Sequence, residues 1–139
     1  MGGSKVDISK REARYEAKLR AYRKGDRVVL NQNEFIRYVL ELQSPPLGLS
    51  WLSVKCGFSF NAIPIQFHSG GAVSSAVPFK LAVLTDQPIA FWQRNTFSPK
   101  EADGIVIHTA RAVLPIVEPP GSHALRLERE AESSQQVRS

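Results

Sequence analysis

The chain holds few of the side chains that enzymes use for nucleophilic or metal chemistry. Its one cysteine, Cys56, could act as a nucleophile with His108 as base and Asp103 as orienting acid. Such a triad is defined by geometry, and no sequence motif joins these three residues. His68, His108 and His123 lack metal-ligand spacing, and the chain has no CxxC pair, Walker A motif or dinucleotide fingerprint. We therefore expect a protein that is not an enzyme, with no catalytic residue, cofactor or metal ion.

The residues that suit binding are basic, and they gather at the N-terminal end. The chain has 18 Lys/Arg, 13 Asp/Glu and a formal net charge of +5. Residues 1–27 hold nine Lys/Arg and four acids, an excess of five, whereas residues 28–139 hold nine of each. A basic block joined to a neutral body predicts an arm that contacts something anionic.

Residues 10–24 predict a single α-helix within this basic block. Ser9 and Glu12 fit a capping box, no Gly, Pro or β-branched residue follows up to position 24, and Gly25 suits a left-handed C-cap. The helix has two acids and seven basic residues, which are Lys10, Arg11, Arg14, Lys18, Arg20, Arg23 and Lys24. This excess is typical of phosphate binding, so we predict these seven as nucleic-acid contacts, with RNA favoured over DNA.

An apolar seam runs along the same helix. At about 100° per residue, Tyr15, Leu19 and Tyr22 fall on one side, with basic residues flanking them. The pattern predicts a seam for a partner, and three uses stay open: packing on the body of the same chain, lying along a nucleic acid or partner protein, or lying on a membrane. The membrane is disfavoured because the seam lacks Trp and Phe.

Beyond residue 27 the apolar residues alternate as they do in strands. The expected strand faces are Leu52, Val54, Cys56, Phe58 and Phe60, then Phe79, Leu81 and Val83; Pro64–Phe67 and Ile89–Trp92 are shorter runs. Residues 34–42 fit either a strand or a short helix, and a long strand over 104–117 carries Pro115, which favours a sheet edge. We predict a mainly β fold, an antiparallel sandwich or barrel of six to seven strands over residues 28–118. The basic helical arm, residues 1–27, precedes it, and a flexible tail, residues 119–139, follows.

Aromatic residues of the body allow two interpretations. Phe91, Trp92 and Phe97 surround Arg94 in the sequence. Aromatic rings beside a cation can stack nucleic-acid bases, but such rings more often fill a hydrophobic core, and we favour the core here.

These patterns predict a nucleic-acid-binding structural protein whose arm contacts phosphates and whose β domain forms a homo-oligomer or larger assembly. A basic arm before a β-sandwich resembles the general plan of small virus coat proteins. The alternative is a non-catalytic interaction module whose N-terminal helix docks on an acidic partner or larger assembly. Because one cysteine excludes an intramolecular disulfide and no signal-type apolar stretch is present, we expect an intracellular, non-secreted protein. The resemblance implies that it is a virion component.

Overall fold

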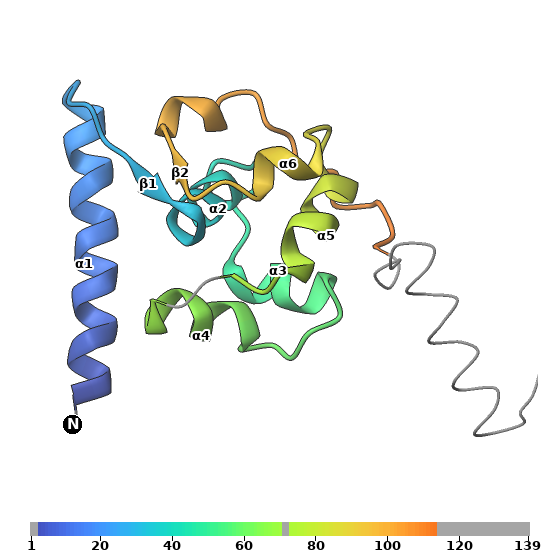
Figure 1. The fold of residues 1–139 in the computed structure, drawn as a ribbon, viewed down its shortest axis with the longest axis horizontal. Coiled ribbons are helices and arrows are strands. Elements are labelled where there is room, and N and C mark those ends of the chain that lie inside the picture. The colour runs from blue at the N-terminus through green and yellow to red at the C-terminus, as the bar shows by residue number, and fades with distance from the viewer. Residues whose placement is uncertain (1–2, 71–72, 114–139) are drawn as a thin grey trace, which may run out of the picture.

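A computed structural model describes residues 3–70 and 73–113 and shows a mainly helical protein (Figure 1). The elements follow in the order α1 (Gly3–Arg23), β1 (Leu30–Asn31), α2 (Gln32–Glu41), α3 (Leu49–Lys55), α4 (Ala62–Ser69), α5 (Ala76–Leu84), α6 (Ile89–Trp92), β2 (Thr96–Phe97) and the 3-10 helix η1 (Pro99–Ala102). Within the described residues the only sheet is the antiparallel pair β1–β2, which aligns Leu30 with Phe97. The predicted sandwich or barrel of six to seven strands was therefore wrong, and with it the β domain that was to drive self-assembly.

The segments expected to be strands are helices because their buried residues follow a helical period. In α3, Leu52 is buried and so is Cys56 four residues later, whereas Val54 between them is 58% exposed. In α4, Ile63 and Phe67 are buried while the intervening Ile65 is 61% exposed. Because apolar residues also lie on the solvent side of each helix, the sequence showed the two-residue apolar alternation that is typical of a strand.

The same difference separates the expected strand at Phe79–Thr85 from the observed α5. Val77, Leu81 and Leu84 are buried at helical spacing, while Phe79 and Val83 are each more than 40% exposed. Apolar residues at two-residue intervals therefore imitated one face of a strand, although only the members spaced three and four apart reach the core.

Helix α2 forms the centre of the main core. Asn31 begins it with a capping box, since its side chain accepts from the Glu34 amide while the Glu34 carboxylate accepts from the Asn31 amide. Four apolar residues of α2 are buried: Phe35, Ile36, Val39 and Leu40. The Phe35 ring stacks on Phe97 of β2 with a centroid distance of 4.1 Å. The range 34–42, which the sequence left open, is thus helical up to Glu41.

Residues 104–113 run along the body without forming a strand, contrary to the long strand expected at 104–117. The Gln43 side chain holds them: its amide donates to the Ile105 carbonyl at 3.0 Å, and its oxygen accepts from the Ile107 amide at 3.0 Å. The Gln43 side chain thus satisfies two backbone groups of this segment that a neighbouring strand would otherwise bond. The remainder of that expected strand, including Pro115, and the expected tail over 119–139 lie outside the described residues.

Helix α1 confirms the prediction at its C-terminus and corrects it at its start. Gly25 has φ of 100°, and the amides of Gly25 and Asp26 donate to the carbonyls of Tyr22 and Ala21. This is a Schellman motif, which ends the helix as expected. The helix begins at Gly3, upstream of Ser9, so the expected capping box at Ser9 does not start it. Among the described residues, no helix is both long enough and apolar enough to cross a bilayer.

Candidate nucleic-acid interface

The inward face of α1 packs on the chain's own body through the predicted seam. Tyr15 and Leu19 are buried in a small cluster with Phe67 of α4. The rings of Tyr15 and Phe67 meet edge to face with centroids 5.9 Å apart, a favourable arrangement for two aromatic rings. Tyr22, the third residue of the seam, is half-buried. Two of the three seam residues are thus occupied within the chain.

Arg37 of α2 connects this cluster to charges on two helices. Its guanidinium lies 4.5 Å from the centroid of Tyr15 and binds both carboxylate oxygens of Glu12, one at 2.7 Å. It also donates to Glu41, which accepts in turn from the Tyr15 hydroxyl at 2.7 Å. The bond from Arg37 holds the pKa of Glu12 below its ordinary range, because the ionised carboxylate is the form that accepts from the guanidinium. Burial and the bond to Glu41 raise the pKa of Tyr15.

Two of the seven predicted phosphate contacts point toward the body instead of solvent. Lys18 donates to the buried carboxylate of Glu34 at 2.7 Å, an ion pair between α1 and α2. Arg11 is half-buried, and its guanidinium lies so close to Gly70 that a Cβ there would overlap it. Gly70 has φ of 77° and ends α4, so Arg11 places its charge where the helix dipole favours a cation.

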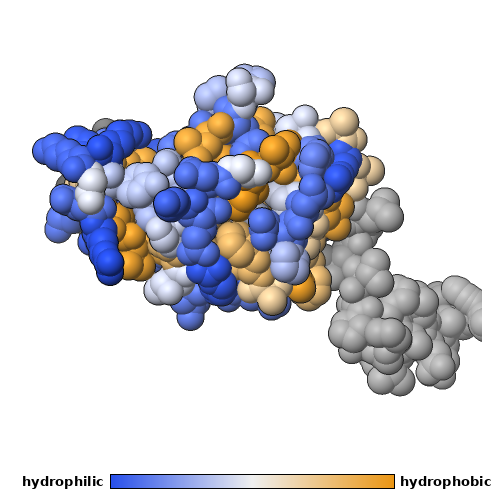
Figure 2. All heavy atoms as spheres, turned by 90° about the horizontal axis from the view of Figure 1, so that it is seen from above, coloured by the Kyte–Doolittle hydropathy of each residue, from blue (hydrophilic) through white to orange (hydrophobic). Residues whose placement is uncertain are grey.

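The other five predicted contacts are exposed on α1. All five are exposed, and within the described residues none forms an ion pair or a side-chain hydrogen bond: Lys10, Arg14, Arg20, Arg23 and Lys24. Ala13 and Ala17 are exposed between them, and Glu16 is the one acid on this stretch of surface. Figure 2 shows hydrophilic side chains gathered at the α1 end of the molecule. Five of the seven predicted residues therefore stay exposed around the solvent-facing half of α1, named here the outward face, with Arg14 and Arg23 at its two opposite edges.

The aromatic residues beside Arg94 belong to the core and not to a base-stacking surface. Trp92 and Phe97 are fully buried, and the Trp92 indole donates to the Thr85 hydroxyl at 3.2 Å. The Arg94 guanidinium covers the Phe97 ring at 4.7 Å and is paired with Glu101 at 2.8 Å. Trp92 and Phe97 are therefore closed to bases, and Phe91 is half-buried with the same paired guanidinium 5.2 Å from its ring centroid.

Cys56, His108 and Asp103 do not form a catalytic set. Burial raises the pKa of the Cys56 thiol to about 11, so the thiol stays protonated and weakly nucleophilic at neutral pH. His108 lies 3.4 Å from Asp86, so its acidic neighbour is Asp86 and not Asp103. No group of three or more His, Cys, Asp or Glu able to hold a metal ion occurs in the described part of the chain.

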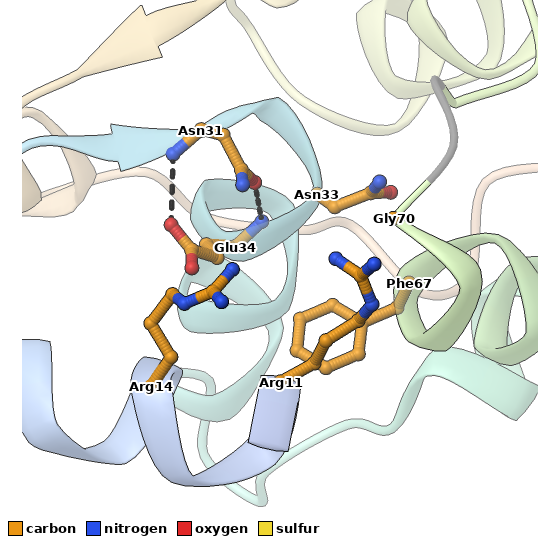
Figure 3. Close-up of a pocket in the computed structure, with 7 residues that line it drawn as sticks. All are labelled: Arg11, Arg14, Asn31, Asn33, Glu34, Phe67 and Gly70. Atoms are coloured by element: carbon orange, nitrogen blue, oxygen red, sulfur yellow. Dashed lines mark hydrogen bonds between the residues drawn. The ribbon is translucent and has the colours of Figure 1, made fainter. Parts of the chain in front are cut away.

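A polar pocket lies where α1, α2 and the end of α4 meet (Figure 3). Its volume is about 50 Å³, and its lining residues are Arg11, Arg14, Asn31, Asn33, Glu34, Phe67 and Gly70. Sequence reasoning proposed only the two arginines. The sequence Asn-Gln-Asn-Glu at 31–34, before the apolar run of α2, carried a usable signal, because it matches the capping box that starts a helix. No local sequence pattern predicted that α1 would pack against α4.

Comparison with known proteins gives no relative from which a function could be transferred. The chain matches no family model, no curated protein and no solved structure. The arrangement of its own residues is what supports a function.

Proposed function

We propose that this protein binds single-stranded nucleic acid, RNA in preference to DNA, through the phosphates that contact the outward face of α1. The observation that carries the proposal is the set of five exposed cations around the solvent-facing half of α1, none of them neutralised by a described residue. Phosphate contacts of this kind supply sequence-independent affinity. The free thiol of Cys56 supports action in a reducing, intracellular setting.

The geometry of the outward face suits an extended polyanion. At about 1.5 Å per residue, Lys10 and Lys24 lie about 21 Å apart along the helix axis, which spans several successive phosphates of a strand. Because Ala13 and Ala17 have short side chains, no bulky group covers the helix backbone between the cations. A strand could therefore approach the backbone of α1 closely along its whole length.

An acidic protein partner is the alternative, and the burial of the seam weakens it. A helix that docks in a protein groove uses apolar anchors at three- and four-residue spacing. The anchors that α1 has at this spacing, Tyr15 and Leu19, are 1% and 4% exposed because they pack on Phe67. An interaction through the outward face would be mainly electrostatic, and nucleic acid is the partner with the required charge density.

The test is the salt dependence of binding to a labelled single-stranded RNA with a 5′-hydroxyl end. Five phosphate contacts predict a slope of log affinity against log salt of about −3.5, at about −0.7 per contact. The double variant Arg20→Gln/Lys24→Gln should lose about 1.4 of that slope. The matched control Lys100→Gln/Arg111→Gln removes the same charge from the body and should leave the slope nearly unchanged.

Three results would decide against the proposal. Equal losses in the two double variants would show a response to net charge alone, without an interface on α1. A wild-type slope near zero would exclude phosphate contacts. Tighter binding to a polyglutamate peptide than to RNA of equal charge would favour the acidic protein partner.

A further inference from the structure

The pocket between α1, α2 and α4 has the charge and the donors of an anion site. Arg11 and Arg14 extend into it from α1, and Asn33 faces them from α2 (Figure 3). Neither arginine forms an ion pair or hydrogen bond with another described residue. The pocket has a volume of about 50 Å³, well below the range of about 300–1,000 Å³ for drug-sized ligands, so it admits only a small group.

The one carboxylate in the lining is already compensated. Glu34 accepts from the ammonium of Lys18 at 2.7 Å and from the Asn31 amide at 3.0 Å. Counting Lys18 with the two arginines, three cations surround one anion, so the pocket keeps a positive charge. The first turn of α2 adds the positive end of a ten-residue helix on the same side.

Arg11 also carries an unsatisfied donor at this place. Its Nε is buried and has no hydrogen-bond partner among the described residues. A buried donor of this kind is rare. Because the Nε has no accessible surface, a ligand in the pocket would contact the two terminal nitrogens of the Arg11 guanidinium. Gly70 lies beside the guanidinium at the end of α4, and a Cβ at this position would displace the guanidinium from where it lies.

We propose that this pocket binds a phosphate group of the terminal, dianionic type. Two guanidinium groups match the oxygens of such a phosphate, which offers more acceptors and more charge than a phosphodiester inside a strand. A pocket also admits the end of a chain more readily than a phosphate with a chain on both sides. Free phosphate compounds and the 5′ end of a nucleic acid both supply the group, and the second source rests on the proposed function of the outward face.

The first arm of the test uses inorganic phosphate and amide NMR. Phosphate should shift the backbone amides of Asn33 and Gly70 and the Nε–H signals of both arginines saturably, relative to chloride at equal ionic strength. The variant Arg14→Gln should lose saturation, whereas Arg20→Gln, which removes the same charge from an exposed site outside the pocket, should keep it. Arg14 is exposed, so its replacement tests the site without disturbing the core.

The second arm compares 5′-phosphorylated with 5′-hydroxyl RNA of one length. Two charge-assisted hydrogen bonds predict about tenfold tighter binding of the phosphorylated strand. This ratio should fall toward one in Arg14→Gln and in Arg11→Lys, which keeps the charge but loses the fork of donors. Arg20→Gln should weaken both strands equally and keep the ratio.

The outcomes separate the pocket from the outward face. Saturable phosphate binding with a tenfold ratio assigns the pocket to nucleic-acid ends, and saturable binding with a ratio of one assigns it to free phosphate compounds. No saturation with a ratio of one overturns the pocket even if RNA binds through the outward face. If hydroxyl RNA does not bind at all, the proposed function fails, and the phosphate titration alone decides the pocket.

Discussion

Both the inward and the outward face of α1 carry charged residues, but among the described residues only those of the inward face are paired with the body. On the inward face Glu12, Tyr15 and Lys18 each have a partner on α2, respectively Arg37, Glu41 and Glu34. On the outward face the five cations have no ion-pair partner in the described part of the chain. Charge on one side of the helix thus fixes α1 to the body, and charge on the other side is left for solvent or a ligand.

This difference shows why a count of charges overstates an interface. Seven basic residues lie on one helix, but Lys18 is neutralised by Glu34 and Arg11 lies against Gly70. The remaining cations stay exposed because the buried Tyr15 and Leu19 determine which side of α1 faces the body. Packing on the inward face therefore decides which cations a nucleic acid could reach.

The largest effect should come from removing the aromatic anchor of the inward face. Tyr15→Ala should lower the free energy of unfolding by about 3–4 kcal/mol, because it deletes a buried ring that packs on Phe67. Arg20→Ala, the control on the outward face, should change it by less than about 0.5 kcal/mol. Urea denaturation followed by circular dichroism measures both. A small effect of Tyr15→Ala would mean that α1 is not fixed to the body.

Arg37→Leu should break the same junction through its charges. The variant removes the hydrogen bonds to Glu12 and Glu41 and leaves their carboxylates without the guanidinium. We expect a loss of about 2 kcal/mol in unfolding free energy, since both carboxylates can still turn toward water. Arg94→Leu is the control, because its pair with Glu101 is exposed and should contribute less than about 1 kcal/mol.

The paired variants Lys18→Gln and Lys10→Gln sharpen the comparison on a single helix. Lys18→Gln leaves the buried Glu34 without its cation and should cost about 1–2 kcal/mol of stability, with little change in the salt slope for 5′-hydroxyl RNA. Lys10→Gln should leave stability unchanged and reduce that slope by about 0.7. Urea denaturation and a salt titration of each protein provide the two readouts. The reverse pattern would place the nucleic acid on the inward side of α1.

The sequence predicted α1 well because its signals are local. A continuous run of helix-forming residues and a glycine at position 25 determine the helix and its end, whatever the rest of the chain does. The start differs because α1 continues upstream to Gly3, although Lys5 is the one strong helix former among residues 3–8, so helix propensity does not explain the extension. The exposure of each cation depends on contacts of α1 with Phe67 and Glu34. Because these residues are distant in sequence from α1, that exposure could not be predicted.

The body was predicted wrongly because its helices are short and apolar on both sides. Val54, Ile65 and Phe79 are each more than 40% exposed on helices of seven to nine residues. A short helix with apolar residues on its solvent side shows the same two-residue alternation as a strand, and only its burial distinguishes the two. In α2 the capping box at Asn31 and Glu34 gave a local helix signal that α3, α4 and α5 lack, since none of these three has a side-chain hydrogen bond at its N-cap.

The smallest effect that distinguishes the two faces is the acid dependence of stability. The bond from Arg37 lowers the pKa of Glu12 from its ordinary value of 4.5, so the carboxylate binds protons more readily in the unfolded chain. The stabilisation is therefore complete above pH 4.5 and is lost as the pH falls through the lower pKa of the folded state. The difference in unfolding free energy between wild type and Arg37→Gln should shrink over this acid range, by an amount limited by the partial exposure of Glu12. Arg20→Gln should follow wild type at every pH, and a parallel decline of wild type and Arg37→Gln would contradict the role of this ion pair.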